Sequence, residues 1–126
     1  MPEGPRHLAA AGSTASLAAY LDTTQADGRQ WVPTLIFYTA IHLTEALLAE
    51  KGVHPEGHTA RANAIGAEWD EAAQDLFEEL RDLSQQWRYS ARPPTDSDVR
   101  AAKEWALQLL SITGQDWPIE GFLVTE

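Results

Sequence analysis

Apolar residues between positions 69 and 87 recur in steps of four and three residues, in strict alternation. The series consists of Trp69, Ala73, Leu76, Leu80, Leu83 and Trp87. Such spacing returns to the same side of a helix at every turn, while most of the intervening positions carry charged side chains. The pattern predicts an amphipathic helix over residues 68–91. Leu80 should lie in the middle of the face that it buries.

Proline and glycine separate this helix from other helical segments. Pro93 and Pro94 should end it, because proline cannot continue a helix and pushes the preceding residue out of helical geometry. Few windows alternate with a period of two, so we expect no sheet. The predicted helices span residues 13–26, 31–51, 58–65, 68–91 and 96–113.

The second of these segments is apolar almost all round, so it should be the central helix. Polar residues interrupt it, and its apolar run is shorter than the roughly 20 residues that cross a bilayer. We therefore expect a buried helix and no membrane. The interrupting residues are Tyr38, His42, Thr44 and Glu45.

The length of 126 residues and the hydrophobic content of 44% suit one domain with a single core. We predict an all-α, up-and-down bundle of four to five helices over residues 13–114. Residues 1–12 should form a loose leader. Residues 115–126 form an apolar tail, which should dock on the bundle or on a partner.

The chain has no cysteine, which excludes disulfides, cysteine-ligated metals and a thiol nucleophile, and suits a reducing cytoplasm. Nothing in its first residues resembles a signal peptide. The net charge of -10 counts against a nucleic-acid binder. Seven carboxylates between Glu68 and Asp82 accompany one arginine, whereas Arg88, Arg92 and Arg100 follow. These basic residues form either a local patch or ordinary solvated helix faces.

Histidines are the groups that could perform acid–base chemistry near neutral pH. His42 should be a buried neutral imidazole with one hydrogen-bonding neighbour, or part of a polar pocket. Glu45 follows it by three residues, so the two share a helix face and form the nearest thing to an acid–base pair. His7, in the predicted leader, should be inert.

His54 and His58 lie four residues apart, which is a metal-ligand spacing on a helix. Pro55 and Gly57 lie between them and indicate a loop, so we expect no metal there. The chain also lacks a Glu-x-x-His step, a nucleophile elbow and glycine-rich phosphate loops. We therefore expect no cofactor.

Arg88, Tyr89 and Arg92 lie at the end of the predicted long helix. Two arginines and a tyrosine could bind a phosphate or stack on a base. Arginines at this position also simply suit the helix dipole.

Two blocks of sequence resemble the HEPN superfamily. Residues 37–52, FYTAIHLTEALLAEKG, followed by Pro55, His58 and Arg61, are similar to the second helix and following loop of HEPN-like proteins. Residues 80–90, followed by Pro94, a polar cap and an alanine-rich helix, are similar to the family's fourth and fifth helices.

The resemblance implies a four- to five-helix bundle that tends to dimerise, in a group found in toxin–antitoxin, phage-defence and RNA-processing systems. Active HEPN ribonucleases are metal-independent and carry an arginine, a polar residue and, a few positions later, a histidine. Here Ser84 stands where relatives have arginine, and Arg88 where they have aspartate. No histidine follows any arginine from Arg61 onward. We therefore expect no nuclease activity.

The leading hypothesis is a non-catalytic HEPN-like protein that acts by binding, as a homodimer or with a protein partner, and that binds RNA only weakly. One alternative is a metal-independent ribonuclease with a rearranged site. Another is a small-ligand or nucleotide-binding module. The candidate residues for these sites are His42, Glu45, His58, Arg61, Arg88 and Tyr89.

Overall fold

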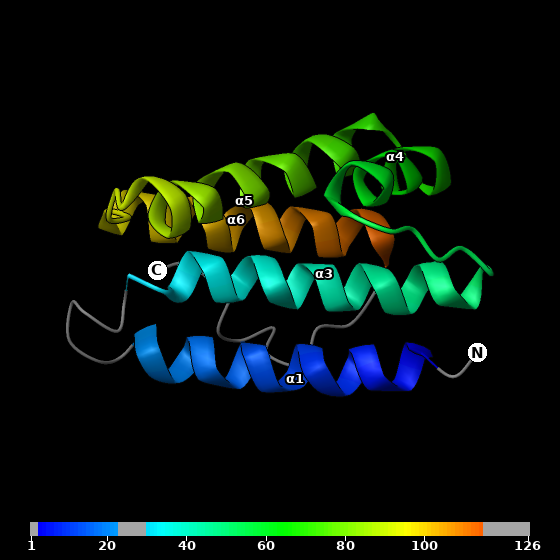
Figure 1. The fold of residues 1–126 in the computed structure, drawn as a ribbon, viewed down its shortest axis with the longest axis horizontal. Coiled ribbons are helices and arrows are strands. Elements are labelled where there is room, and N and C mark those ends of the chain that lie inside the picture. The colour runs from blue at the N-terminus through cyan, green and yellow to red at the C-terminus, as the bar shows by residue number, and fades with distance from the viewer. Residues whose placement is uncertain (1–2, 23–29, 115–126) are drawn as a thin grey trace.

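The computed structural model describes residues 3–22 and 30–114. Within these ranges the chain is all-α, and no strand is present, which confirms the predicted helical bundle. Successive long helices run in opposite directions, and the short α4 lies over one end of the bundle (Figure 1). The helices are α1 (Glu3–Asp22), α3 (Val32–Glu50), α4 (His58–Glu68), α5 (Glu71–Ser90) and α6 (Asp96–Thr113).

α3 lies at the centre, as its apolar composition predicts, and packs against α1, α4, α5 and α6. It is long and apolar enough to cross a membrane by length and composition, but 67% of that span is buried inside the bundle. The Phe37 ring of α3 lies 5.4 Å from the Phe77 ring of α5, measured between centroids. These two side chains join the central helix to the amphipathic one.

The middle of the predicted apolar series is the buried face of α5, whereas Trp69 ends α4 and Trp87 is only partly buried. Ala73, Phe77, Leu80 and Leu83 belong to the hydrophobic core, and Leu76 packs beside them. Leu80 is only 1% exposed. Acidic side chains line the outer side of this helix, as expected for an amphipathic helix.

The predicted leader is wrong over residues 3–12, because α1 begins at Glu3. Proline is tolerated in a first helical turn, so Pro5 does not prevent this early start. Alanines 9–11 favour the helical state, and Ala11 is fully buried. The prolines and glycine near the start suggested a loose segment, but packing on α3 stabilises a helix there. Residues 23–26 of the predicted first helix and the predicted tail, 115–126, lie outside the described residues.

α6 spans the predicted residues 96–113, whereas α3, α4 and α5 differ from their predicted ranges by one to three residues at one or both ends. α4 continues to Glu68, past Gly66, which does not end it as predicted. A β-carbon at Gly66 would meet the side-chain amide of Gln74 on α5, so glycine leaves room for that side chain. α5 begins only after Asp70, whose side chain accepts a hydrogen bond from the backbone N–H of Ala73. Such caps define helix starts more sharply than apolar periodicity does.

Candidate functional site

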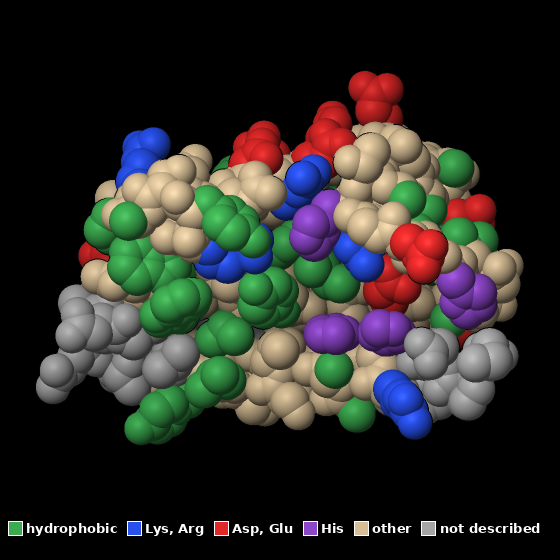
Figure 2. Space-filling model, in the orientation of Figure 1, with side chains coloured by type: hydrophobic (Ala, Val, Ile, Leu, Met, Phe, Trp, Pro, Cys, Tyr) green, Lys and Arg blue, Asp and Glu red, His purple; other side chains and the backbone are tan. Residues whose placement is uncertain are grey.

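Histidine and arginine side chains gather on one face of the molecule, below the acidic edge of the bundle (Figure 2). They come from α1, α3, α4 and α5, which are far apart in sequence. We call this surface the arginine–histidine face. Its residues are His7, His42, His58, Arg61, Arg81 and Arg88.

His7 of α1 and His42 of α3 are hydrogen-bonded, with their Nδ1 atoms 2.9 Å apart. The prediction that His7 is inert therefore fails in its structural part, because α1 brings its ring against α3. Burial lowers the pKa of His42, and the neighbouring His7 and Arg61 lower it further, while Glu45 raises it. His42 is thus a partly buried imidazole with one hydrogen-bonding neighbour, which corresponds to the first of the two alternatives.

Glu45 pairs with Arg61 and not with His42 as a hydrogen-bonding partner. The Nε atom of Arg61 donates to Oε1 of Glu45, and the two side chains are only 13% and 10% exposed. This ion pair connects α3 to α4. Glu45 and His42 therefore form no acid–base pair, although their charges act on one another.

His58 lies beside Arg61, with Nδ1 3.1 Å from Nη1 of the arginine. Because a guanidinium only donates, His58 Nδ1 must accept, and its ring proton must be on Nε2. Burial lowers the pKa of His58, and the charges of three arginines lower it further. His58 is thus a neutral imidazole at neutral pH. The three arginines are Arg61, Arg81 and Arg88.

Arg88 is held by neighbours from two helices. Its Nη2 donates to Oγ of Ser84 at 3.1 Å, and its Nη1 lies 3.3 Å from the hydroxyl oxygens of both Tyr38 and Tyr89. The guanidinium also lies 5.5 Å from the Tyr38 ring and 4.9 Å from the Tyr89 ring. Among the described contacts none joins Arg88 to His42; on α3, Arg88 contacts Tyr38, which lies one helical turn before His42.

Arg81 is the residue that the sequence reading missed, because it stands among the carboxylates of the outer α5 face. Its Nε atom is buried and has no hydrogen-bond partner among the described residues. Arg81 precedes Arg88 by seven residues, or two helical turns, and this spacing alone indicates a shared helix face. Tyr38, four residues before His42, is recognisable by the same argument.

Ser84 lies between these two arginines and is fully buried. Its hydroxyl donates to the backbone carbonyl of Arg81 at 2.8 Å and accepts from Nη2 of Arg88. Ser84 therefore positions the guanidinium of Arg88. Within the described ranges, no carboxylate forms an ion pair with Arg81 or Arg88.

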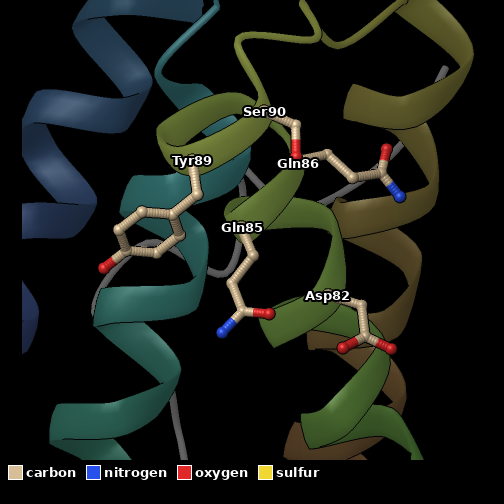
Figure 3. Close-up of a pocket in the computed structure, with 5 residues that line it drawn as sticks. All are labelled: Asp82, Gln85, Gln86, Tyr89 and Ser90. Carbon is tan, nitrogen blue, oxygen red and sulfur yellow. The ribbon is translucent and has the colours of Figure 1, made fainter.

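An open groove follows the outer side of α5 next to Arg88. Tyr89 and Gln85 extend to one side of the helix, and the remaining lining side chains are also polar (Figure 3). Tyr89 is 73% exposed and belongs to both the groove and the surroundings of Arg88. The lining residues are Asp82, Gln85, Gln86, Tyr89 and Ser90.

His54 is exposed in the loop before α4, whereas His58 is the first residue of that helix. The two histidines thus do not share a helix face. In the part of the chain that the structure describes, no three histidine, aspartate or glutamate side chains are placed to hold a metal ion.

Comparisons of the chain with protein-family models, curated proteins and solved structures gave no match. The chemistry of the arginine–histidine face therefore has to be argued from its own residues.

Proposed function

We propose that this chain is a HEPN-like protein that acts by binding, and that the arginine–histidine face binds an anionic ligand. The observation that supports this most directly is that Arg81 and Arg88 have no carboxylate partner among the described residues. The protein has 19 acidic residues and only nine lysines and arginines, so carboxylates are abundant. Two neighbouring cations without such partners favour an external anion.

The arrangement favours binding over catalysis, because most of the groups that could catalyse are occupied by other protein groups. Arg61 is bound to Glu45, Nδ1 of His58 to Arg61, and Nδ1 of His42 to His7. Metal-free RNA cleavage needs a base to take the 2′-hydroxyl proton and a cation to stabilise the phosphate. These engagements, with the missing motif, argue against a ribonuclease.

A metal-independent ribonuclease is nevertheless the second candidate, and His58 is the observation that favours it. This histidine is neutral at neutral pH and stands among three arginines. In such an arrangement a neutral imidazole could act as the general base, and the neighbouring arginines could bind the phosphate. A direct assay of RNA cleavage distinguishes the two candidates.

The acidic side of α5 should limit binding of long polyanions. Exposed carboxylates there include Asp75, Glu79 and Asp82, on the helix that carries Arg81 and Arg88. Their repulsion acts over a Debye length of about 8 Å at physiological salt. RNA binding should therefore be weak and sensitive to salt. From the sequence we also propose that the protein acts as a homodimer or with a protein partner, in the cytoplasm. A toxin–antitoxin or defence system is the setting that the resemblance suggests.

The test uses a labelled single-stranded RNA, the full chain and EDTA. Fluorescence anisotropy at about 50 mM and 200 mM salt measures binding, and a denaturing gel measures cleavage. We expect intact RNA, with weak binding that Arg88→Ala reduces. Arg100→Ala removes the same charge from an exposed position on α6 and should leave binding nearly unchanged.

Two results would contradict the proposal. Cleavage in EDTA that disappears in His58→Ala would make the chain a ribonuclease. Equal binding by Arg88→Ala and the parent would show that the arginine–histidine face is not the binding surface.

A further inference from the structure

Arg81, Arg88 and His58 offer hydrogen-bond donors from two neighbouring helices, α5 and α4. Arg61 is also close, but Glu45 neutralises its charge. Two positive charges therefore remain around the neutral His58. Resting on the proposed function, we propose that these three residues bind the terminal phosphate group of a phosphomonoester.

The buried Nε atom of Arg81 is the first argument. A buried N–H without a partner is unfavourable, so native structures rarely retain one. A phosphate group supplies several acceptor oxygens at once, and a guanidinium that turns towards it satisfies such a donor with a charge-assisted hydrogen bond. Among the described residues, none supplies an acceptor for this atom.

The fixed position of Arg88 is the second argument. Ser84 and Tyr38 hold the guanidinium, and its stacking beside Tyr89 limits its motion further. A donor that is held in place loses less entropy when it binds a ligand. Ser84 also donates to the backbone carbonyl of Arg81, which fixes the hydroxyl that accepts the hydrogen bond from Arg88.

The protonation of His58 is the third argument. Arg61 occupies Nδ1, which leaves Nε2 as the atom that carries the ring proton. A neutral N–H donor adds a hydrogen bond without adding a charge. The site then has two cations for a phosphomonoester, which carries a charge of about -1.5 to -2 at neutral pH.

Charge also allows the site to distinguish a terminal phosphate from the phosphodiester backbone of a nucleic acid. A diester linkage carries one negative charge, and its flanking nucleotides would pass the carboxylates of α5. A terminal phosphate brings more charge to the two arginines and has a free end. The site should therefore prefer the end of a phosphorylated molecule to the interior of a polyanion.

The experiment compares one RNA sequence with a 5′-phosphate and with a 5′-hydroxyl, and adds inorganic phosphate and ribose 5-phosphate as competitors. The 5′-phosphorylated RNA should bind about tenfold more tightly, which is the effect of one or two charge-assisted hydrogen bonds. Ribose 5-phosphate should compete. If inorganic phosphate competes as strongly as ribose 5-phosphate, the site recognises the phosphate group alone. If ribose 5-phosphate competes more strongly, the site also contacts the sugar.

Arg81→Gln should remove the preference for the 5′-phosphate, and Arg81→Lys should retain part of it, because lysine keeps the charge but lacks the planar fork. Arg100→Gln is the matched control on α6 and should keep the preference. Circular dichroism checks that each variant is folded. Binding of phosphate should strengthen from about pH 5.5 to 7.5 as the second phosphate proton is lost.

The failures of the two proposals are distinguishable. Equal affinity for both RNA ends, unchanged in Arg81→Gln, overturns the phosphomonoester site while leaving anion binding at the face intact. Absence of binding to either RNA and to ribose 5-phosphate overturns both. A preference for the 5′-phosphate that both folded Arg81 variants retain in full also overturns this site.

Discussion

His7 and His42 meet through their Nδ1 atoms at 2.9 Å, with ring centroids 5.2 Å apart and ring planes tilted by 32°. One ring must donate and the other must accept, so at least one of these nitrogens carries no proton. The hydrogen bond therefore joins α1 to α3 only while the two rings are not both cationic. Glu45 and Arg61 act on the same site from α3 and α4 with opposite charges.

Acidification should destabilise the protein. Burial, chiefly, lowers the pKa of His42 below its ordinary value of 6.5, so the unfolded chain takes up a proton before the folded one does. His58 shifts in the same direction. The free energy of unfolding should thus fall as the pH decreases from about 6.5 towards the lowered pKa values. Urea denaturation at about pH 7.5 and pH 5 measures this change.

The contribution of His42 can be isolated with His42→Asn, which keeps a polar group near the Nδ1 position but does not titrate. This variant should show a smaller loss of stability between the two pH values than the parent does. His54→Asn changes an exposed histidine in the loop before α4 and should behave like the parent. A pH dependence unaltered by His42→Asn would assign the titration to other groups.

Leu80→Ala should lower the free energy of unfolding by about 2–5 kcal/mol, because it leaves a cavity in the core of the bundle. The side chain is 1% exposed. Leu17→Ala is the control, since Leu17 of α1 is 48% exposed and its truncation should cost about 0.5 kcal/mol or less. Equal denaturation midpoints for Leu80→Ala and the parent would show that Leu80 contributes nothing to the core.

The Glu45–Arg61 pair should show strong coupling, because both partners are largely buried. Glu45→Gln alone should destabilise the fold by about 3 kcal/mol, as it leaves a buried guanidinium without its counter-charge. The double variant Glu45→Gln with Arg61→Gln should recover part of this loss. A double-mutant cycle measured by chemical denaturation tests this, and strictly additive effects would contradict it.

Ala91→Gly should stabilise the protein by about 1 kcal/mol. Ala91 ends α5 in the left-handed region with φ of 52°, where a β-carbon is unfavourable and glycine is not. The comparison variant is Ala72→Gly, at an exposed position inside α5, which should destabilise by up to about 1 kcal/mol. Thermal melting of both variants should therefore show shifts of opposite sign.

The long-range pattern of apolar residues was sufficient to predict the bundle. The four-and-three spacing from Ala73 to Leu83 describes the face of α5 that packs in the core, and this signal can be recognised without knowing which elements pack against it. The first helix was predicted too short because prolines and small residues near the start suggested a loop. Only the packing of Ala11 and its neighbours on α3 decides in favour of a helix, and local sequence does not contain that information.

The candidate site was predicted in part. Six residues were singled out from the sequence, and the structure brings five of them into two hydrogen-bonded groups. Glu45, Arg61 and His58 form one group, and Arg88 and Tyr89 form the other. The sixth, His42, is hydrogen-bonded to His7. Arg81 was not recognised from the sequence, because an arginine among carboxylates is typical of the solvent-exposed face of a helix. His7 was predicted to have no role, because it was assigned to a loose leader. Both depend on contacts between helices, which a periodic pattern within one helix does not reveal.

The way in which α1 is attached has a consequence for the dynamics of the molecule. Among the α1 side chains whose burial the structure describes, the buried ones are the small Ala11, Ala15 and Ala18, and Thr14 is hydrogen-bonded to Thr39 of α3 at 2.7 Å. Short side chains bring the two backbones close but remove little apolar area from water. Amide protons of α1 should therefore exchange through a sub-global opening that leaves α3, α5 and α6 folded, whereas those of α3 exchange only when the whole domain unfolds.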